Sequence, residues 1–271
     1  MDEDSDKQNQ QQNKESNLTA RGKNNFHSSD KTEFKNYVFQ FLMVFLGITA
    51  GFFVENIREN YVESKKAEEY AGSLYEDLVA DTANLHHAIN VSLLTVQRID
   101  TLLSLLNQED ASKITGGELY YYGALSLRYQ NFIPNKSTIN QLISTGSIQY
   151  FKNYSIEKSI ADYNQALLIL NYQQETENQT YMEKVKFIET IFDGNIFSQV
   201  LYKDLTQNFI NSFLNKNYRL LTYNKKELKE FANFCEFRKQ FLIIKANDMY
   251  KNPLNKAVSL INELKKEYNF K

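Results

Sequence analysis

The chain contains no tryptophan, one cysteine, two prolines and nine glycines among its 271 residues. The single cysteine, Cys235, excludes an intramolecular disulfide bond and a cysteine-based zinc site. Proline and glycine mark turns and strand ends, so their scarcity over this length favours helices. With 31 basic and 33 acidic residues the net charge is −2, and this balance gives no indication of nucleic acid as a partner. The sequence therefore predicts an all-α protein.

The side chains that usually carry catalysis and metal binding are also scarce. Only three histidines are present, and His86 stands five positions after Asp81, whereas metal ligands on a helix are three or four residues apart. The sequence has no G-x-S-x-G turn, no phosphate-binding glycine loop and no Cys–His pair near a turn. Cys235 lies among phenylalanines, which is typical of a core position. We therefore expect no enzyme, no metal site and no cofactor.

One uncharged stretch, residues 37–54, is long enough to cross a membrane. Its 18 residues would extend about 27 Å as a helix, close to the roughly 30 Å of a bilayer core. Aromatic residues flank the stretch, as is typical at the lipid headgroups, and it has no polar face of the kind a buried core helix shows. A cleaved signal peptide fits poorly, because no small-x-small cleavage site follows. We predict a transmembrane helix over residues 34–56, with the lipid bilayer as its partner.

Basic residues near this helix are slightly more numerous on its N-terminal side. Four precede it and three follow it: Arg21, Lys23, Lys31 and Lys35, then Arg58, Lys65 and Lys66. The N-terminal tail carries no signal of its own. Both observations predict an uncleaved signal anchor in the inner (cytoplasmic) membrane of a bacterium, with a cytoplasmic N-terminus and a periplasmic C-terminal domain.

Two glycines inside the predicted span, Gly47 and Gly51, form a G-x-x-x-G pair. Such a pair lets two membrane helices approach closely and often marks a dimer face. Glycine is also common in membrane helices, so chance spacing is the alternative. One of the two interpretations of this pair is therefore a homo-oligomer that forms through the transmembrane helix.

On either side of the span the sequence changes character. Residues 1–33 are rich in Gln, Asn, Ser and charge and lack an apolar period, so we expect a disordered polar tail. From Glu55 to Leu106 leucines and other apolar residues recur at steps of three and four, which predicts a long helix continuing from the membrane. Residues 57–271 would then form the helical-bundle domain. A loop is expected over 107–117, and Tyr120, Tyr121 and Tyr122 in the next helix suit a pocket wall or, more commonly, packing.

The stretch STINQLISTG predicts a short helix with both ends specified. Thr138 and Gln141 have the spacing of a capping box, in which the hydroxyl accepts from the N3 amide and the glutamine returns to the cap amide. Gly146 can adopt the left-handed conformation that ends a helix.

A heptad-like pattern follows from Ser155 to Phe192, which is typical of helices packed side by side and favours a coiled coil. Its polar centre, Gln173–Thr180, leaves two alternatives: a solvated bend between two helices, or a helix that projects past the bundle. Further helices are expected over 195–215, 227–250 and 254–268, the last opened by Pro253. The expected fold is a transmembrane helix continuing into a long helix, followed by an antiparallel helical bundle.

Three segments carry a resemblance to a known family: Phe45–Asn60, Glu69–Asp81 and Ser137–Asn153. They resemble a family of uncharacterised single-pass bacterial membrane proteins, described only as a domain of unknown function. In the last segment the family pattern is matched through Ser137, Thr138, Leu142 and Gly146. The resemblance implies an apolar helix with a small-residue turn followed by a helical domain, and it transfers no activity and no functional residues.

These observations lead to two hypotheses for function. The first is a membrane-anchored helical scaffold or interaction module that faces the periplasm and contacts an envelope protein of unknown identity. The second is a periplasmic ligand-sensing bundle that signals through a partner protein, because the short tail is too small to serve as an output domain.

Overall fold

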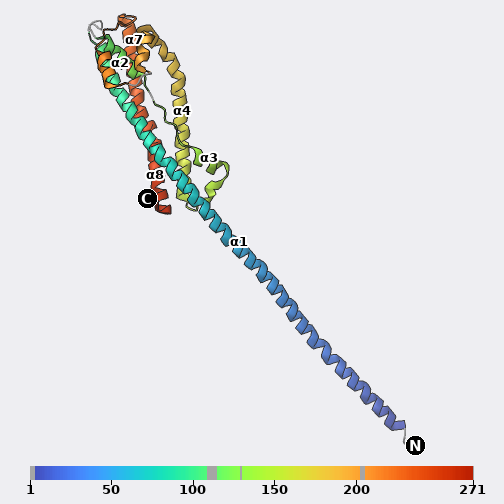
Figure 1. The fold of residues 1–271 in the computed structure, drawn as a ribbon. Helices are drawn as coiled ribbons and strands as arrows, with labels where there is room; N and C mark the ends of the chain where they lie inside the picture. Colours follow the sequence, from blue (N-terminus) through green and yellow to red (C-terminus); the bar gives the residue numbers. More distant parts are fainter. Residues whose placement is uncertain (1–3, 109–114, 129, 202–204, 271) are drawn as a thin grey trace. The chain divides into compact units, whose positions relative to one another are not determined.

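A computed structural model describes the backbone of residues 4–108, 115–128, 130–201 and 205–270. It also describes the side chains of these residues, except those of 4–32 and 180–184. Every regular element in this part is a helix, which confirms the predicted all-α class. Of the loop expected over 107–117, residues 109–114 lie outside the described part. The elements in chain order (Figure 1) are α1 (Asp4–Leu106), α2 (Gly116–Ser126), α3 (Ser137–Ser144), the 3-10 helix η2 (Ser147–Tyr150), α4 (Tyr154–Ile191), α5 (Gly194–Leu201), α6 (Gln207–Leu214), α7 (Lys225–Ile244), the π-helix η3 (Lys245–Met249) and α8 (Lys251–Tyr268).

The chain divides into two compact units, Met1–Ser64 and Lys65–Lys271, and α1 contributes to both. In the first unit the helix begins at Asp4, whereas the sequence led us to expect a disordered polar tail over 1–33. The tail is rich in Gln, Glu and Lys, which are good helix formers, and it contains no proline. A helix that extends backward from the apolar stretch also needs no new nucleation.

The apolar stretch lies within α1. Among the described residues, α1 holds the one stretch long and apolar enough to cross a membrane, with a mean hydropathy of 2.0 over its best 18-residue window and no buried residue in that window. A Cβ added at Gly47 or Gly51 would meet nothing within 4 Å. Both glycines therefore leave an open helix face, and the predicted dimer contact stays a prediction.

The second unit is a helical bundle with two groups of buried side chains. One group joins residues 71–89 of α1 to α3, to the first half of α4 and to α8. The other joins Ile99 and Leu102 of α1 to α2, to the end of α4 and to α5, α6 and α7. The apolar steps predicted for α4 are confirmed by Ile156, Ile160 and Tyr163, which are fully buried. Burial of these regularly spaced residues holds the bundle together.

Gly117 and Gly146 are two of the positions in the bundle that require glycine. Gly117, at the start of α2, lies so close to the chain after α6 that an added Cβ would stand 2.1 Å from the Phe213 carbonyl oxygen. Gly146 follows α3 with a φ of 67°, a left-handed backbone conformation that residues other than glycine rarely adopt. This is the conformation that the sequence predicts for Gly146 at the end of the helix.

Helix α7 passes into α8 through a single wide turn. In η3 the Tyr250 amide donates to the carbonyl of Lys245, five residues earlier, at 3.0 Å. Pro253 follows in the first turn of α8, and proline can neither donate to the carbonyl four residues before it nor tolerate that carbonyl nearby. We attribute the widened turn to this proline. The helix expected to open near Leu254 therefore begins at Lys251.

Candidate functional site: a cleft between α4 and α7

The segment 127–136 joins α2 to α3, and its described residues, all but residue 129, lie partly in the bundle interior and are not helical. Buried backbone groups in such a segment need partners from elsewhere. Gln174 of α4 supplies two, because its Nε2 donates to the Phe132 carbonyl at 3.0 Å and its Oε1 accepts from the Phe132 amide at 2.8 Å. The Tyr250 hydroxyl donates to the Gln130 carbonyl at 2.6 Å. Side chains of α4 and of the α7–α8 helices thus hold this segment in place.

Arg238 of α7 stabilises the end of α2 in the same way. Its Nε donates to the Ser126 carbonyl at 2.7 Å, and its Nη2 donates to the carbonyls of Leu127 and Arg128 at 3.2 and 3.3 Å. These are carbonyls at the C-terminal end of a helix, where the backbone lacks intrahelical partners and a cation is favoured. The guanidinium group therefore acts as a helix cap supplied by another helix.

Arg238 belongs to a buried charged cluster with Glu177 and Lys245. The Glu177 Oε2 atom accepts directly from the Lys245 ammonium, and its Oε1 atom lies 4.0 Å from Arg238 Nη1. Lys245 also donates to Asn131 Oδ1 at 3.3 Å. Burial lowers the pKa of Lys245, and the Glu177 carboxylate acts in the opposite direction. One carboxylate thus serves two cations in the interior, where an uncompensated charge would be costly.

This cluster corrects the interpretation of Gln173–Thr180. The segment is neither a solvated bend nor a helix projecting from the bundle, because α4 is helical throughout it and Gln174 and Glu177 are buried. The two residues continue the spacing of four and three that Leu170 begins. Polar residues occupy these core positions because the backbone of buried Phe132 and the cations of α7 and η3 need hydrogen-bond partners there.

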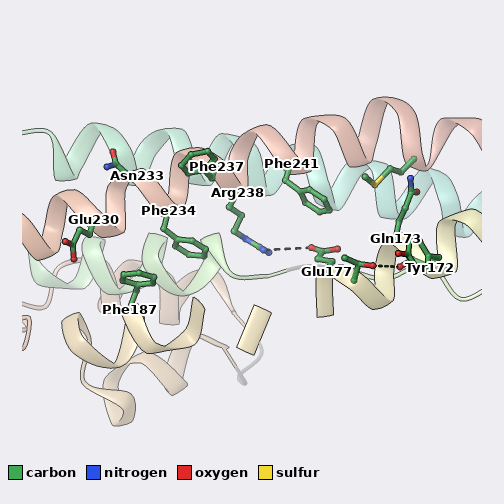
Figure 2. Close-up of a pocket in the computed structure, with 12 residues that line it drawn as sticks. Tyr172, Gln173, Glu177, Phe187, Glu230, Asn233, Phe234, Phe237, Arg238 and Phe241 are labelled. Carbon is green, nitrogen blue, oxygen red and sulfur yellow. Dashed lines mark hydrogen bonds and ion pairs between the residues drawn. The ribbon is translucent and has the colours of Figure 1, made fainter. Parts of the chain in front are cut away.

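Beside this cluster, α4 and α7 enclose a cleft of about 880 Å³ (Figure 2). This volume falls within the roughly 300–1,000 Å³ of sites that hold small molecules. Five of the twelve lining residues are aromatic. Among them, Phe187 stacks on Phe234 with ring centroids 6.2 Å apart, and Phe237 is 79% exposed. The lining residues are Tyr172, Gln173, Thr176, Glu177 and Phe187 of α4, Glu230, Asn233, Phe234, Phe237, Arg238 and Phe241 of α7, and Met249 of η3.

The charged side chains that line this cleft have partners within the protein, since Arg238 bonds to backbone carbonyls, Glu177 pairs with Lys245 and Glu230 lies 3.9 Å from Lys226. Cys235 is buried on α7, as the sequence indicated, and burial raises the pKa of its thiol to about 12. A thiol with such a pKa does not form the reactive thiolate at neutral pH. Within the described part of the chain, no group of three or more His, Cys, Asp and Glu side chains could hold a metal ion. The cleft is suited to binding an apolar group.

None of the candidate site residues predicted from the sequence is among those that line this cleft. Gly47 and Gly51 are in the first unit, and Thr138, Gln141 and Gly146 are at α3. Tyr120 is buried, where its hydroxyl donates to the Arg219 carbonyl at 3.0 Å and accepts from the Asp193 amide at 2.8 Å. This supports the interpretation of Tyr120 as a packing residue.

The capping box predicted for α3 is wrong. Lys136 occupies the N-cap, and no side chain in that position caps the helix. The Thr138 amide instead donates to Asp77 Oδ2 of α1 at 3.3 Å. Gln141 Nε2 donates to the Tyr70 hydroxyl at 3.4 Å rather than to a cap amide. Carboxylates of another helix replace the local cap, because they are charged acceptors placed at the positive end of α3.

Asp81, one turn further along α1, accepts two hydrogen bonds from other parts of the bundle. Its Oδ1 accepts from the Asn135 amide at 2.8 Å, and its Oδ2 accepts from the Tyr163 hydroxyl at 2.7 Å. Burial raises the pKa of Asp81, and the two hydrogen bonds oppose this rise. His86 is exposed on the same helix. Asp81 and His86 therefore do not converge on a metal position.

Glu177, Arg238 and Lys245 were not identified from the sequence, although a signal for them exists. Along α7 and into η3, residues recur at steps of four and three: Phe231, Cys235, Arg238, Leu242 and Lys245. Arg238 and Lys245 therefore share the buried face with apolar residues, as Gln174 and Glu177 do on α4. Charged residues in register with a buried stripe on two helices indicate a buried ion pair.

The chain has no significant match among protein-family models, curated proteins or solved structures. The resemblance to the family of single-pass membrane proteins therefore stays a hypothesis, and function has to be argued from the site alone.

Proposed function

We propose that this protein is a non-catalytic binding module, held at a bacterial inner membrane by the apolar stretch of α1, and that it binds in the cleft between α4 and α7. The observation that carries the proposal is an aromatic cleft of about 880 Å³ in the bundle. Phe237 and Tyr172 at this cleft are 79% and 71% exposed. Large exposed aromatic side chains gathered in one place mark binding sites more often than chance exposure.

A scaffold or interaction module follows from the way the charged residues are used. Arg238 donates to the carbonyls of Leu127 and Arg128, Gln174 bonds to the backbone of Phe132, and Lys245 pairs with Glu177. Groups committed to such bonds are poorly placed to change partners during a reaction. We therefore place binding, with an envelope protein or an exported molecule as the counterpart, ahead of catalysis.

A ligand-sensing bundle is the second candidate, and the position of η3 favours it. Met249, in the wide turn that joins α7 to α8, lines the cleft. Wide turns of this kind often occur at functional sites, and a ligand beside one could shift α8 relative to α7. A sensor of this design passes its signal to a partner protein in the envelope.

Topology tests the location. A reporter active only in the periplasm, fused after Lys271, is expected to be active, and a reporter active only in the cytosol is expected to be silent. The expectation rests on the basic residues that precede the span. The reverse pattern would place the bundle in the cytoplasm and overturn the proposed orientation.

Crosslinking in intact cells tests the cleft. A photo-reactive phenylalanine analogue at Phe237 is expected to form an adduct, identified by mass spectrometry, that the same analogue at Tyr154 does not form. Tyr154 is the matched control because it is 75% exposed and lies on α4 outside the cleft. Adducts that are absent or identical at the two positions would remove the cleft as the binding site.

A further inference from the structure

The aromatic cleft has the dimensions of an elongated ligand. Its lining residues run from Tyr172 to Phe187 on α4 and from Glu230 to Phe241 on α7, which correspond to about 22 Å and about 17 Å of helix at 1.5 Å per residue. Figure 2 shows the side chains of these residues following the helices in a row. A volume of about 880 Å³ spread over such a length makes the cleft long and narrow.

The walls of the cleft are apolar and adaptable. Phe187, Phe234, Phe237 and Phe241 line the cleft together with Met249, and most of the lining surface is apolar. Aromatic faces and methionine make dispersion contacts with flexible apolar groups without demanding a fixed shape. Such walls suit a hydrocarbon chain better than a rigid polar molecule.

The charges along the cleft are matched within the protein. Arg238 faces Glu177, Glu177 also binds Lys245, and Glu230 lies 3.9 Å from Lys226 one helical turn away. A strongly charged ligand would have to compete with these contacts. Neutral polar groups accompany them, with Asn233 toward one end of the lining and Gln173 toward the other. A ligand whose body is apolar and whose polar group stays at a mouth of the cleft fits this pattern.

A partner helix fits the cleft less well. An α-helix with its side chains is about 10–12 Å across, so a helix as long as the cleft needs more space than about 880 Å³. A single hydrocarbon chain is much thinner. The apolar stretch of α1 would also keep the bundle beside a bilayer, which is a local source of such chains.

We propose that the cleft between α4 and α7 binds one extended hydrocarbon chain, as found in fatty acids and lysophospholipids, with the polar end of the ligand at a mouth of the cleft. This inference rests on the proposed binding role of the cleft and names its ligand class. The chain lies along Phe234, Phe237 and Phe241, and the buried ion cluster beneath it remains paired.

The absence of tryptophan makes a direct test possible in the full chain reconstituted in lipid nanodiscs. A Phe237→Trp variant supplies a single tryptophan at the cleft, and Tyr154→Trp supplies one on α4 outside it. Dibrominated stearic acid, whose bromine atoms quench tryptophan on contact, is expected to quench the first variant saturably. Unlabelled stearic acid is expected to restore the emission. A second titration with a brominated lysophospholipid distinguishes the two sources of the chain.

A second pair of variants tests the position of the chain. Phe241→Glu, in the Phe237→Trp background, places a carboxylate inside the cleft. It is expected to raise the ligand concentration that gives half-maximal quenching by at least about tenfold, because burying a charge against hydrocarbon is costly. Ile244→Glu adds the same charge to an exposed position of α7 outside the lining and is expected to leave quenching unchanged.

Equal quenching at positions 237 and 154, or none in either titration, would overturn the inference. If such a result accompanied a crosslink specific to position 237 in cells, the hydrocarbon class would be wrong and the cleft would still bind something else. If both experiments failed, the proposed binding function would fail with the inference.

Discussion

Three buried charged residues stabilise the interior of this bundle. Glu177 lies between Lys245 and Arg238, and all three side chains are buried. Arg238 has backbone carbonyls as additional acceptors, whereas the Lys245 ammonium depends mainly on Glu177 and Asn131. The carboxylate is therefore the member of the cluster whose loss affects both cations at once.

We expect Glu177→Gln to destabilise the bundle by about 3–5 kcal/mol, because it leaves two buried cations without their carboxylate. Lys245→Met is expected to cost less, about 1–3 kcal/mol, since Glu177 keeps Arg238 as its counter-ion. Urea denaturation followed by circular dichroism gives both free energies of unfolding. A loss for Lys245→Met equal to or larger than that for Glu177→Gln would show that Glu177 is not the central member.

Asp81 and Tyr163 give a prediction that depends on pH. Burial raises the pKa of Asp81 above 3.8, so the contribution of this carboxyl to stability is fully present below 3.8 and is lost as the pH rises through the folded-state pKa. The Tyr163 hydroxyl donates to the charged form and limits this loss. Tyr163→Phe is therefore expected to cost about 1–3 kcal/mol at pH 7 and less as the pH is lowered toward 4.

Tyr250→Phe is the control for this prediction. The Tyr250 hydroxyl donates to the Gln130 backbone carbonyl at 2.6 Å, an acceptor that does not titrate in this range. Its removal should cost a similar free energy of unfolding without a change between pH 7 and pH 4. Parallel pH profiles for the two variants would mean that Asp81 does not titrate with a raised pKa.

At the scale of elements, the start of α3 depends on contacts with another helix. Asp77 of α1 accepts from the Thr138 amide, and Asp81 accepts from the Asn135 amide just before the helix. Eight residues are too few for an isolated helix to be stable in water. The start of α3 is therefore fixed by α1 rather than by its own sequence.

We expect Asp77→Ala to destabilise the bundle by about 0.5–2 kcal/mol, the usual cost of a lost cap. Thr138→Val keeps the shape of a buried residue and removes a hydroxyl that does not cap the helix, so its effect on the free energy of unfolding should be smaller. A larger effect of Thr138→Val than of Asp77→Ala, measured by chemical denaturation, would restore the capping box predicted from the sequence.

The sequence predicted most helices of the bundle, because apolar residues recur with the helical period over long stretches. It misplaced part of the buried stripe of α1, where Ser92 and Thr95 are buried and Leu93 is exposed. The two hydroxyls bond to carbonyls four residues earlier, so these polar residues can lie in the core without unsatisfied groups. A reading based on apolar residues alone cannot find such positions.

The cleft could be predicted least from the sequence. Its lining combines residues of α4 with residues some fifty positions later on α7, and a single sequence does not show which helices diverge. The N-terminal end of α3 was predicted wrongly for the same physical reason, since its partners lie on α1. Local signals such as Gly146 succeeded because the left-handed turn depends on that residue alone.

At the scale of the whole molecule, the chain combines a stretch of α1 suited to a membrane with a bundle that has its own core. Each of the two units has an exposed apolar surface: the open helix face at Gly47 and Gly51 in one and the aromatic cleft in the other. A homodimer through α1 would place two clefts on one membrane assembly. Association of the spans and binding in the cleft can therefore be tested independently.

The last prediction concerns association of the membrane helices. If Gly47 and Gly51 form a contact face, Gly51→Leu should weaken self-association in liposomes by about tenfold or more, because close approach of the helices depends on the missing side chains. Thr49→Leu adds bulk on the opposite side of the same helix and should have little effect. Energy transfer between separately labelled full-length chains measures both. An equal effect of the two substitutions, or none, would mean that the glycine pair arises from the general composition of membrane helices and that any oligomer forms through the bundle.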